Sequence, residues 1–339
     1  MKVEFKHIQS AHCENGVTVN LLHYYGIEQL TEPLVFGIGS GIFFIYIPFL
    51  QVNNAPAISY RSAPGTIFSR TCKALDIPLV RKKFRSPQKA EQELLECLRA
   101  GQPVGCQVGV YFLPYFPREY RFHFNAHNLV VYGKENGHYL ISDPVMETTT
   151  RLTPYELERV RFAKGTFSPK GQLYYPRERK AVSREQIARA IIKGIRRTHW
   201  DMVKIPLPFM GVNGIRFTAR KIRKWRGQLG LKKAGAYLAQ LVRMQEEIGT
   251  GGGGFRFIYA AFLQQAYQYI PDEDFIRLSE RFTQAGDNWR AAAVQAAGIY
   301  KGRLTQQSDF NHMADMLEAI ADLEKQAFTE LKKIANKHE

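Results

Sequence analysis

Cysteine, acidic residues and long apolar runs are all scarce in this sequence. Only four cysteines occur in 339 residues, and no two of them form a Cys-x-x-Cys pair. This scarcity excludes a disulfide-stabilised scaffold and a zinc ribbon, and we expect no metal site. The opening residues, MKVEFKH, lack the basic-then-apolar pattern of a signal peptide. We therefore expect a cytoplasmic protein, in a reducing compartment where a cysteine remains a free thiol.

The longest uncharged stretch is short for a membrane span. Residues 33–60 contain no charged side chain, and residues 34–50 are nearly continuous apolar sequence. A spanning helix needs about 20 such residues, and this run is interrupted by glycines and by Pro48. We expect a buried loop and strand here, with a membrane segment as the alternative.

Acidic residues are outnumbered by basic ones, and the excess is local. The chain has 47 Lys plus Arg against 31 Asp plus Glu, for a net charge of +16. Residues 176–233 contain 17 basic and three acidic residues, and so account for most of that excess. Such a segment attracts a polyanion, which could be an acidic protein, an anionic membrane or nucleic acid; the alternative is a solvated basic surface without a partner. No nucleic-acid-binding motif is present, so we expect no nucleic acid partner.

Periodicity predicts two domains of different character. With 45% hydrophobic residues the chain can bury a sizeable core. The first half mixes expected helices at 14–25 and 86–99 with expected strands at 104–112, 128–132 and 139–142. The second half is helical, with expected helices at 184–197, 215–229, 233–247, 255–269, 274–300 and 309–336. The sequence therefore predicts an α+β fold, with an amino-terminal domain at 1–175 and an all-helical carboxy-terminal domain at 176–339.

One cysteine lies in a setting that suits a nucleophile. Cys13 comes just where the first helix begins, and the dipole and free N–H groups of a helix N-terminus favour a thiolate. Those N–H groups can also stabilise an oxyanion on an attacked carbonyl. The other cysteines, Cys72, Cys97 and Cys106, lack such a setting, and the last two lie among core leucines and valines.

A histidine and an aspartate flank the two strands expected near the middle of the chain. His127 begins one strand, Asp143 ends the next, and residues 134–137 form the expected turn between them. If these strands pair as a hairpin, His127 and Asp143 stand at matching ends and can touch. Cys13, His127 and Asp143 then supply a nucleophile, a base and a residue that orients the base. His123 is the competing base, but it lies in an irregular segment.

These motifs resemble a known family. The order of Cys13, a His-x-x-Val-Val-x-Gly strand and a strand ending in Asp-Pro resembles the papain-like fold of bacteriocin-processing peptidases. The residues His-Cys-Glu at 12–14, the glycine-rich residues 36–41 and residues 127–144 resemble more closely the amino-terminal domain of the butirosin biosynthesis protein H family. Residues 246–256, EEIGTGGGGFR, resemble the glycine-rich signature of that family's helical carboxy-terminal domain.

The resemblance implies a papain-like cysteine-peptidase-like amino-terminal domain that performs acyl transfer, with Cys13, His127 and Asp143 at the triad positions. In that family an acyl group passes from the phosphopantetheine thioester of an acyl carrier protein to a small-molecule acceptor. This implies an acyl-Cys13 intermediate, an amine or hydroxyl acceptor and a role in secondary-metabolite or antibiotic biosynthesis. It implies no bound cofactor, because phosphopantetheine arrives on the carrier protein. The peptidases place an oxyanion-stabilising Gln six residues before the cysteine, where this chain has His7, and Gln9 is the nearest substitute.

Two further segments fit a carrier-bound donor. Gly251, Gly252 and Gly253 precede an expected helix and could present N–H groups to the pantetheine phosphate, with Arg256 adding charge; a flexible loop is the alternative. The basic helix expected at 215–229 offers a docking surface to an acidic carrier protein or to a membrane surface, through these side chains: Arg220, Arg223, Lys224 and Arg226.

Three readings therefore stand beside one another. The first is a cysteine acyltransferase that uses an acyl carrier protein. The second is a papain-like peptidase, amidase or thioesterase with the same nucleophile. The third is a catalytically inactive module that binds a carrier protein or a membrane.

Overall fold

The computed structural model describes residues 1–52 and 54–338, and the chain divides into two compact units. One unit consists of Met1–Val35 and Ile67–Ser183, and the other of Phe36–Thr66 and Arg184–Glu339. The sequence predicts a single division at residue 175. The structure differs because residues 36–66 group with the carboxy-terminal helices, so that the second unit is built from two separate pieces of chain.

The first unit is built on a six-stranded antiparallel sheet with the strand order β3-β8-β4-β5-β6-β7. Its strands are β3 (Leu79–Lys82), β4 (Val104–Val108), β5 (His127–Glu135), β6 (His138–Ser142), β7 (Thr150–Leu152) and β8 (Leu173–Pro176). The expected hairpin is confirmed: β5 and β6 pair across a turn in which Asn136 and Gly137 both have positive φ, as a two-residue hairpin requires. A register shift between Val131 and Gly133 places one extra residue on β5 in the middle of the pairing.

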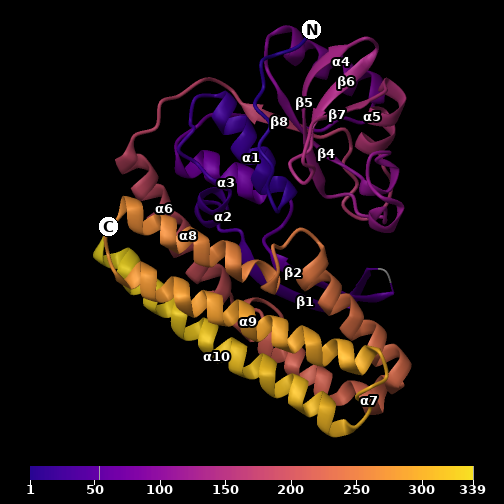
Figure 1. Ribbon diagram of the computed structural model, residues 1–339, viewed down its shortest axis with the longest axis vertical. Helices are drawn as coiled ribbons and strands as arrows, with labels where there is room; N and C mark the ends of the chain where they lie inside the picture. Colours follow the sequence, from indigo (N-terminus) through magenta and orange to yellow (C-terminus); the bar gives the residue numbers. More distant parts are fainter. Residues whose placement is uncertain (53, 339) are drawn as a thin grey trace. The chain divides into compact units, whose positions relative to one another are not determined.

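Helices cover this sheet on its faces (Figure 1). They are α1 (Cys13–Tyr24), α4 (Pro87–Arg99) and α5 (Pro154–Arg161), and α3 (Thr66–Ala74) lies beside α1, where the N–H of Ile67 donates to Glu14. Ser86 caps α4 by accepting a hydrogen bond from the N–H of Lys89, and Gly101, with a φ of +71°, follows its end. Cys97 and Cys106 lie in the core that α4 and α5 form with the sheet, which confirms that they act as small apolar residues.

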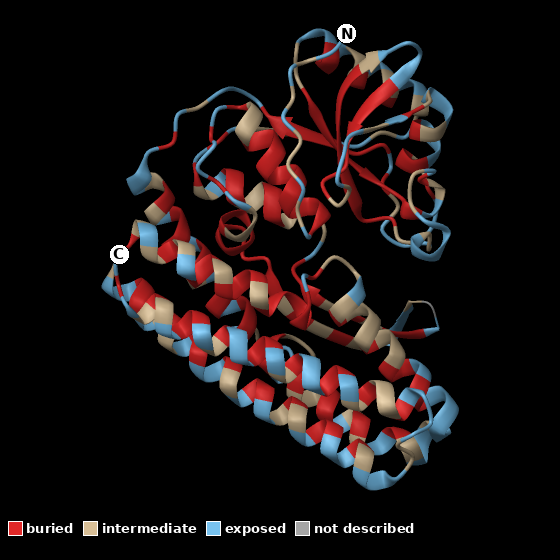
Figure 2. Cartoon of the chain, in the orientation of Figure 1, coloured by how far each residue is buried: buried red, intermediate tan, exposed pale blue. Residues whose placement is uncertain are grey.

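The second unit combines a β-hairpin with long helices (Figure 1). The hairpin strands are β1 (Ile42–Val52) and β2 (Ala55–Arg61), and α2 (Glu32–Ile38) leads the chain into this unit. The helices are α6 (Arg184–His199), α7 (Gly211–Val242), α8 (Arg256–Tyr269), α9 (Asp274–Tyr300) and α10 (Gln307–Lys337). Exposed and buried residues alternate along α9 and α10 so that each helix has one buried side (Figure 2).

Helix α7 joins two helices that the sequence predicts separately. Gly230 within it has a φ of +73°, which is not helical, so the helix is kinked at this residue. The expected core stripe of α10 is confirmed, because these side chains are all buried: Met313, Leu317, Ile320, Leu331 and Ile334.

Aromatic packing explains why the hairpin belongs to the second unit. The rings of Phe44 on β1 and Tyr60 on β2 lie 5.8 and 5.1 Å from the ring of Trp289 on α9. All three side chains are almost completely buried. The uncharged stretch at 34–50 is thus the end of α2 and most of β1, and across residues 1–52 and 54–338 we find no helix with the length and apolarity to span a bilayer.

Candidate active site

The candidate nucleophile is the first residue of α1. His12 is the N-cap of this helix, in an extended conformation, and its side chain accepts a hydrogen bond from the N–H of Asn15. The carboxylate of Glu32 accepts hydrogen bonds from the N–H groups of Ala11 and His12, at 2.9 and 2.8 Å. These contacts fix the turn that presents Cys13 at the helix N-terminus. The Cys13 side chain is 7% exposed.

The two strands of the hairpin bring His127 and Asp143 together. His127 Nε2 lies 2.7 Å from Asp143 Oδ2, and both side chains are buried. The sulfur of Cys13 lies near the imidazole, since it contributes to the raised pKa of His127. Because Nε2 faces Asp143, Nδ1 is the ring nitrogen that remains for the sulfur. The three residues that the sequence singled out therefore meet in one place, in the order nucleophile, base and orienting carboxylate.

The surroundings of His127 favour its protonated form. Burial lowers the pKa of His127, but the negative charges of Asp143 and Cys13 and the hydrogen bonds with both outweigh burial and raise it to about 10. His127 is therefore an imidazolium at neutral pH. An imidazolium beside the sulfur is the counter-ion that a thiolate on Cys13 needs.

A loop rich in aromatic residues covers the His127–Asp143 pair. Tyr115 donates a hydrogen bond of 2.8 Å to Asp143 Oδ2, the same oxygen that contacts His127. Burial and the charge of Asp143 raise the pKa of Tyr115 well above 10, so its hydroxyl stays a donor. The ring of Phe116 meets the imidazole of His127 edge-on at 5.3 Å. Sequence reasoning missed both residues, because only the folded loop brings them to the hairpin.

The other expected polar groups lie elsewhere in the first unit. His123, the competing base, is exposed and its ring stacks on Tyr111 at 4.1 Å. His7, at the position where the peptidases have Gln, contacts Ser142 and the carbonyl of Met146 with its two ring nitrogens. Gln9 is exposed, whereas the three residues of the candidate triad are buried. The structure thus favours His127 over His123 and gives neither His7 nor Gln9 a contact with the sulfur.

One buried amide beside the sulfur escaped sequence reasoning. Asn128 Nδ2 lies 3.9 Å from Cys13 Sγ, and Asn128 Oδ1 accepts a hydrogen bond of 2.8 Å from the hydroxyl of Tyr174. The only sequence signal for a position near Cys13 was that Asn128 directly follows His127.

The glycine-rich segment of the second unit forms hydrogen bonds with side chains of that same unit. Residues 251–255 all have positive φ, and the N–H of Gly253 donates to the carboxylate of Glu246 at 3.1 and 3.2 Å. An acidic side chain of the same unit therefore sits where the sequence led us to expect a phosphate contact at Gly251, Gly252 and Gly253.

Arg256 also differs from its expected role. Its guanidinium is fully buried and forms two 2.8 Å hydrogen bonds with Glu324, whose carboxylate also accepts from the indole of Trp289. This arginine is a core residue, and the buried carboxylate of Glu324 compensates its charge.

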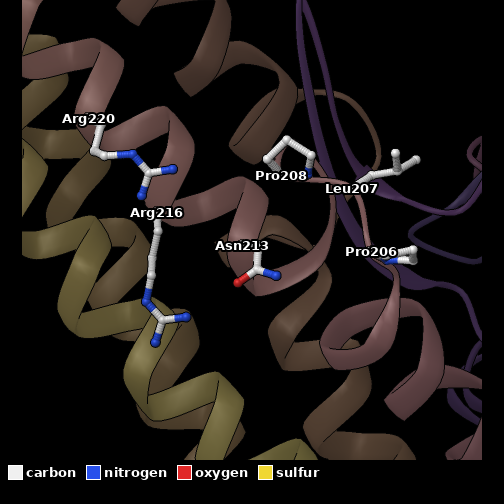
Figure 3. Close-up of a pocket in the computed structure, with 6 residues that line it drawn as sticks. All are labelled: Pro206, Leu207, Pro208, Asn213, Arg216 and Arg220. Carbon is white, nitrogen blue, oxygen red and sulfur yellow. The ribbon is translucent and has the colours of Figure 1, made fainter.

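The four expected docking residues on α7 divide into two groups. Arg223 pairs with Asp315 and Glu318 on α10, and Arg226 donates to the carbonyl of Thr305. Arg220 and Lys224 are exposed. Arg220 lines a surface hollow at the start of α7, shown in Figure 3 with its other lining residues: Pro206, Leu207, Pro208, Asn213 and Arg216.

Comparisons with known proteins match two consecutive parts of the chain to two families. Residues 155–331 match a family described as a domain of unknown function (DUF4872), and residues 12–144 match the family "Butirosin biosynthesis protein H, N-terminal". No curated protein matches the chain. Among solved structures, the chain is similar to a Bacillus anthracis protein described as a C39-like peptidase, with 17% identity and a TM-score of 0.37. That similarity covers 53% of this chain and 100% of the other.

Proposed function

Because the chain belongs to the butirosin biosynthesis protein H-like family, with a DUF4872 domain over more than half its length, we propose that it is a cysteine acyltransferase. In this proposal it is a papain-like cysteine enzyme, which the match of residues 12–144 to the butirosin biosynthesis protein H amino-terminal family supports. In our proposal the donor is an acyl group on the phosphopantetheine arm of an acyl carrier protein, and the acceptor is an amine or a hydroxyl of a small molecule. The observation that carries the proposal is the meeting of Cys13, His127 and Asp143 in one buried cluster.

The first half of the reaction uses the imidazolium of His127 as an acid. The Cys13 thiolate attacks the thioester carbonyl, and the carbon–sulfur bond to pantetheine then breaks. The proton on His127 passes to the departing pantetheine sulfur, which leaves an acyl-Cys13 thioester and a neutral imidazole. Exchange of one thioester for another is nearly isoenergetic, so the acyl-Cys13 thioester is about as reactive toward the acceptor as the donor was.

The second half restores the enzyme. The acceptor attacks the acyl-Cys13 carbonyl while His127 takes its proton, and the Cys13 sulfur departs as a thiolate beside the regenerated imidazolium. Asp143 holds the ring so that the same nitrogen serves both halves, and Tyr115 holds Asp143. Hydrolysis in place of acceptor attack would make the same site a thioesterase, and attack on an amide would make it a peptidase.

The proposal is tested by mass spectrometry of the whole protein and its peptides after brief incubation with acyl-pantetheine thioesters, free and on carrier protein. We expect an added acyl mass on the Cys13 peptide, absent from Cys13→Ala and present in Cys72→Ala. Cys72 is the matched control, because it is a buried thiol whose pKa burial raises to about 12. Absence of an adduct with every donor would contradict the acyltransferase, and cleavage of peptides by the parent but not by Cys13→Ala would favour the peptidase.

We also propose that the carrier protein docks on the exposed cations of α7. The exposed pair Arg220 and Lys224 is available for an acidic partner, whereas Arg223 and Arg226 serve the packing of α7 against its own unit. The double change to Glu at Arg220 and Lys224 should weaken acylation by carrier-bound donor about tenfold or more at low salt, and leave acylation by free acyl-pantetheine unchanged. The matched control reverses two exposed lysines of α10, Lys325 and Lys333. Equal loss with both donors, or in both double variants, would refute docking at this site.

A further inference from the structure

We propose that Asn128 is a further catalytic residue, whose side-chain amide donates a hydrogen bond to the Cys13 sulfur and stabilises its thiolate. Tyr174 is the positioning residue that keeps the amide in the donating orientation. This inference rests on the part of the proposed function that makes Cys13 the reacting thiol. It does not depend on the identity of donor or acceptor.

The hydrogen bonds around Asn128 determine which end of its amide faces the sulfur. Nδ2 lies 3.9 Å from Cys13 Sγ and donates to the carbonyl of Ala126 at 3.1 Å, while Oδ1 accepts from the hydroxyl of Tyr174 at 2.8 Å. A flipped amide would place its oxygen against the carbonyl oxygen of Ala126, where no donor exists. The donating orientation toward Cys13 is therefore the one that satisfies every partner.

The hydroxyl of Tyr174 is suited to this role over a wide pH range. Burial and the neighbouring charges of Glu14 and Cys13 raise the pKa of Tyr174 well above 10. The hydroxyl therefore stays protonated when the sulfur is a thiolate and continues to donate to Asn128.

A glycine on β4 leaves room for the side chain of Tyr174 to reach across that strand to Asn128. Tyr174 lies on β8, Asn128 on β5, and β4 runs between these two strands. The residue of β4 that pairs with Tyr174 is Gly105, where a Cβ atom would lie only 2.5 Å from the tyrosine ring. A glycine in the middle of a buried strand costs stability, and here it leaves space for the ring that spans the strand. Phe68 packs on the same ring at 4.7 Å and holds it in place.

The hydrogen bond from Asn128 stabilises the thiolate form of Cys13 in particular. A thiolate that has little access to water needs hydrogen-bond donors to replace solvent. His127 supplies a charged donor and Asn128 a neutral one, from two consecutive residues of β5. The hydrogen bond from Asn128 to Cys13 weakens when the sulfur becomes an acyl thioester. It strengthens again when the acyl group is transferred and the sulfur becomes a thiolate. Asn128 therefore favours both the attacking thiolate and the departing one.

The test is the rate of Cys13 alkylation by iodoacetamide as a function of pH, followed by peptide mass spectrometry on the full chain. The variants are Asn128→Leu, which removes the donor, Asn128→Asp, which keeps the shape and the contact with Tyr174, and Tyr174→Phe. The matched control is Tyr175→Phe, the next residue of β8, which lies in the same core cluster as Cys97. Unfolding by urea shows whether each variant is folded.

We expect Asn128→Leu to raise the pH midpoint of alkylation by about one unit, and so to slow alkylation about tenfold below the midpoint. Asn128→Asp should slow it further, because its carboxylate opposes the thiolate. Tyr174→Phe should give a smaller shift in the same direction, and no further shift when combined with Asn128→Leu. Tyr175→Phe should leave the midpoint unchanged.

Two results would overturn the inference. One is a folded Asn128→Leu or Asn128→Asp with the midpoint of the parent protein. The other is an equal shift in Tyr174→Phe and Tyr175→Phe, which would mean a general effect on strand β8. The measurement uses no acyl donor, so a shifted midpoint stands even where the acylation experiment fails.

Discussion

The change Asp143→Asn removes the charge that keeps His127 protonated. Burial alone lowers the pKa of His127, and the charges and hydrogen bonds of Asp143 and Cys13 raise it from 6.5 to about 10. That rise corresponds to about 5 kcal/mol in favour of the imidazolium. Asparagine has nearly the same volume but no charge, so burial then dominates. We expect the pKa of His127 in the variant to lie near or below 6.5.

The direct assay is an NMR titration of the imidazole C–H resonances of the full chain, with His127→Gln to assign the signal. Loss of the imidazolium at neutral pH should also slow the alkylation of Cys13 at pH 7 by about ten- to a hundredfold. Asp201→Asn is the control, because Asp201 is a buried aspartate of the second unit that pairs with Arg197. A variant in which His127 still titrates near pH 10 would refute the reasoning.

The same change predicts a pH dependence of stability. The folded pKa of His127 is raised, so its contribution to the free energy of unfolding is complete below about pH 6.5 and is lost as pH rises toward 10. The parent should therefore lose more stability than Asp143→Asn between pH 6.5 and 10, by a few kcal/mol in urea unfolding. Parallel decline of the two proteins would contradict this assignment.

Three further changes test the rest of the site and the fold. Tyr115→Phe leaves Asp143 with one donor fewer, so we expect a small rise in the pKa of His127 and a loss of about 1–2 kcal/mol in urea unfolding; a fall in that pKa would contradict the assignment. Glu32→Gln weakens the acceptor that fixes the turn before Cys13. It should cost about 1–2 kcal/mol and slow alkylation at fixed pH, and an unchanged rate would show that the turn holds without it. Glu324→Leu leaves the Arg256 guanidinium buried and unpaired, and should cost about 3–5 kcal/mol in urea unfolding. The double variant with Arg256→Met should recover most of that loss, and failure to recover it would indicate a role beyond charge compensation.

The candidate cluster of Cys13, His127 and Asp143 was predictable because its residues depend on short-range patterns. Cys13 follows the N-cap of a helix, and His127 and Asp143 flank a hairpin whose turn is marked by Asn136 and Gly137. Each of these signals lies within a few residues of the side chain it positions. The pairing of β5 with β6 then needed no knowledge of the rest of the sheet.

The residues that support the cluster were not predictable in this way. Tyr174 reaches Asn128 only because β8 and β5 flank β4, an order that no local pattern reveals. Tyr115 lies in a loop whose path depends on the finished sheet. Arg256 follows four glycines and looked like a phosphate ligand, but its partner Glu324 is 68 residues away along the chain. Long-range pairing, more than residue type, decided what these side chains do.

The boundary of the second unit was obscured for a related reason. Residues 36–66 read as a buried loop and strand, which they are in part, yet nothing in their own sequence says which helices bury them. The aromatic contacts of Phe44 and Tyr60 with Trp289 decide that question.

The split construction of the second unit has a consequence during synthesis. The ribosome releases Phe44 and Tyr60 roughly 230 residues before it releases Trp289, which buries them. At about 5–20 residues per second this interval is on the order of 10–45 s. Throughout it, the hairpin presents apolar side chains and open strand edges to the surroundings, and such edges promote aggregation. The second unit therefore needs more than the continuous segment 184–339, because it also includes residues 36–66, which the ribosome releases much earlier.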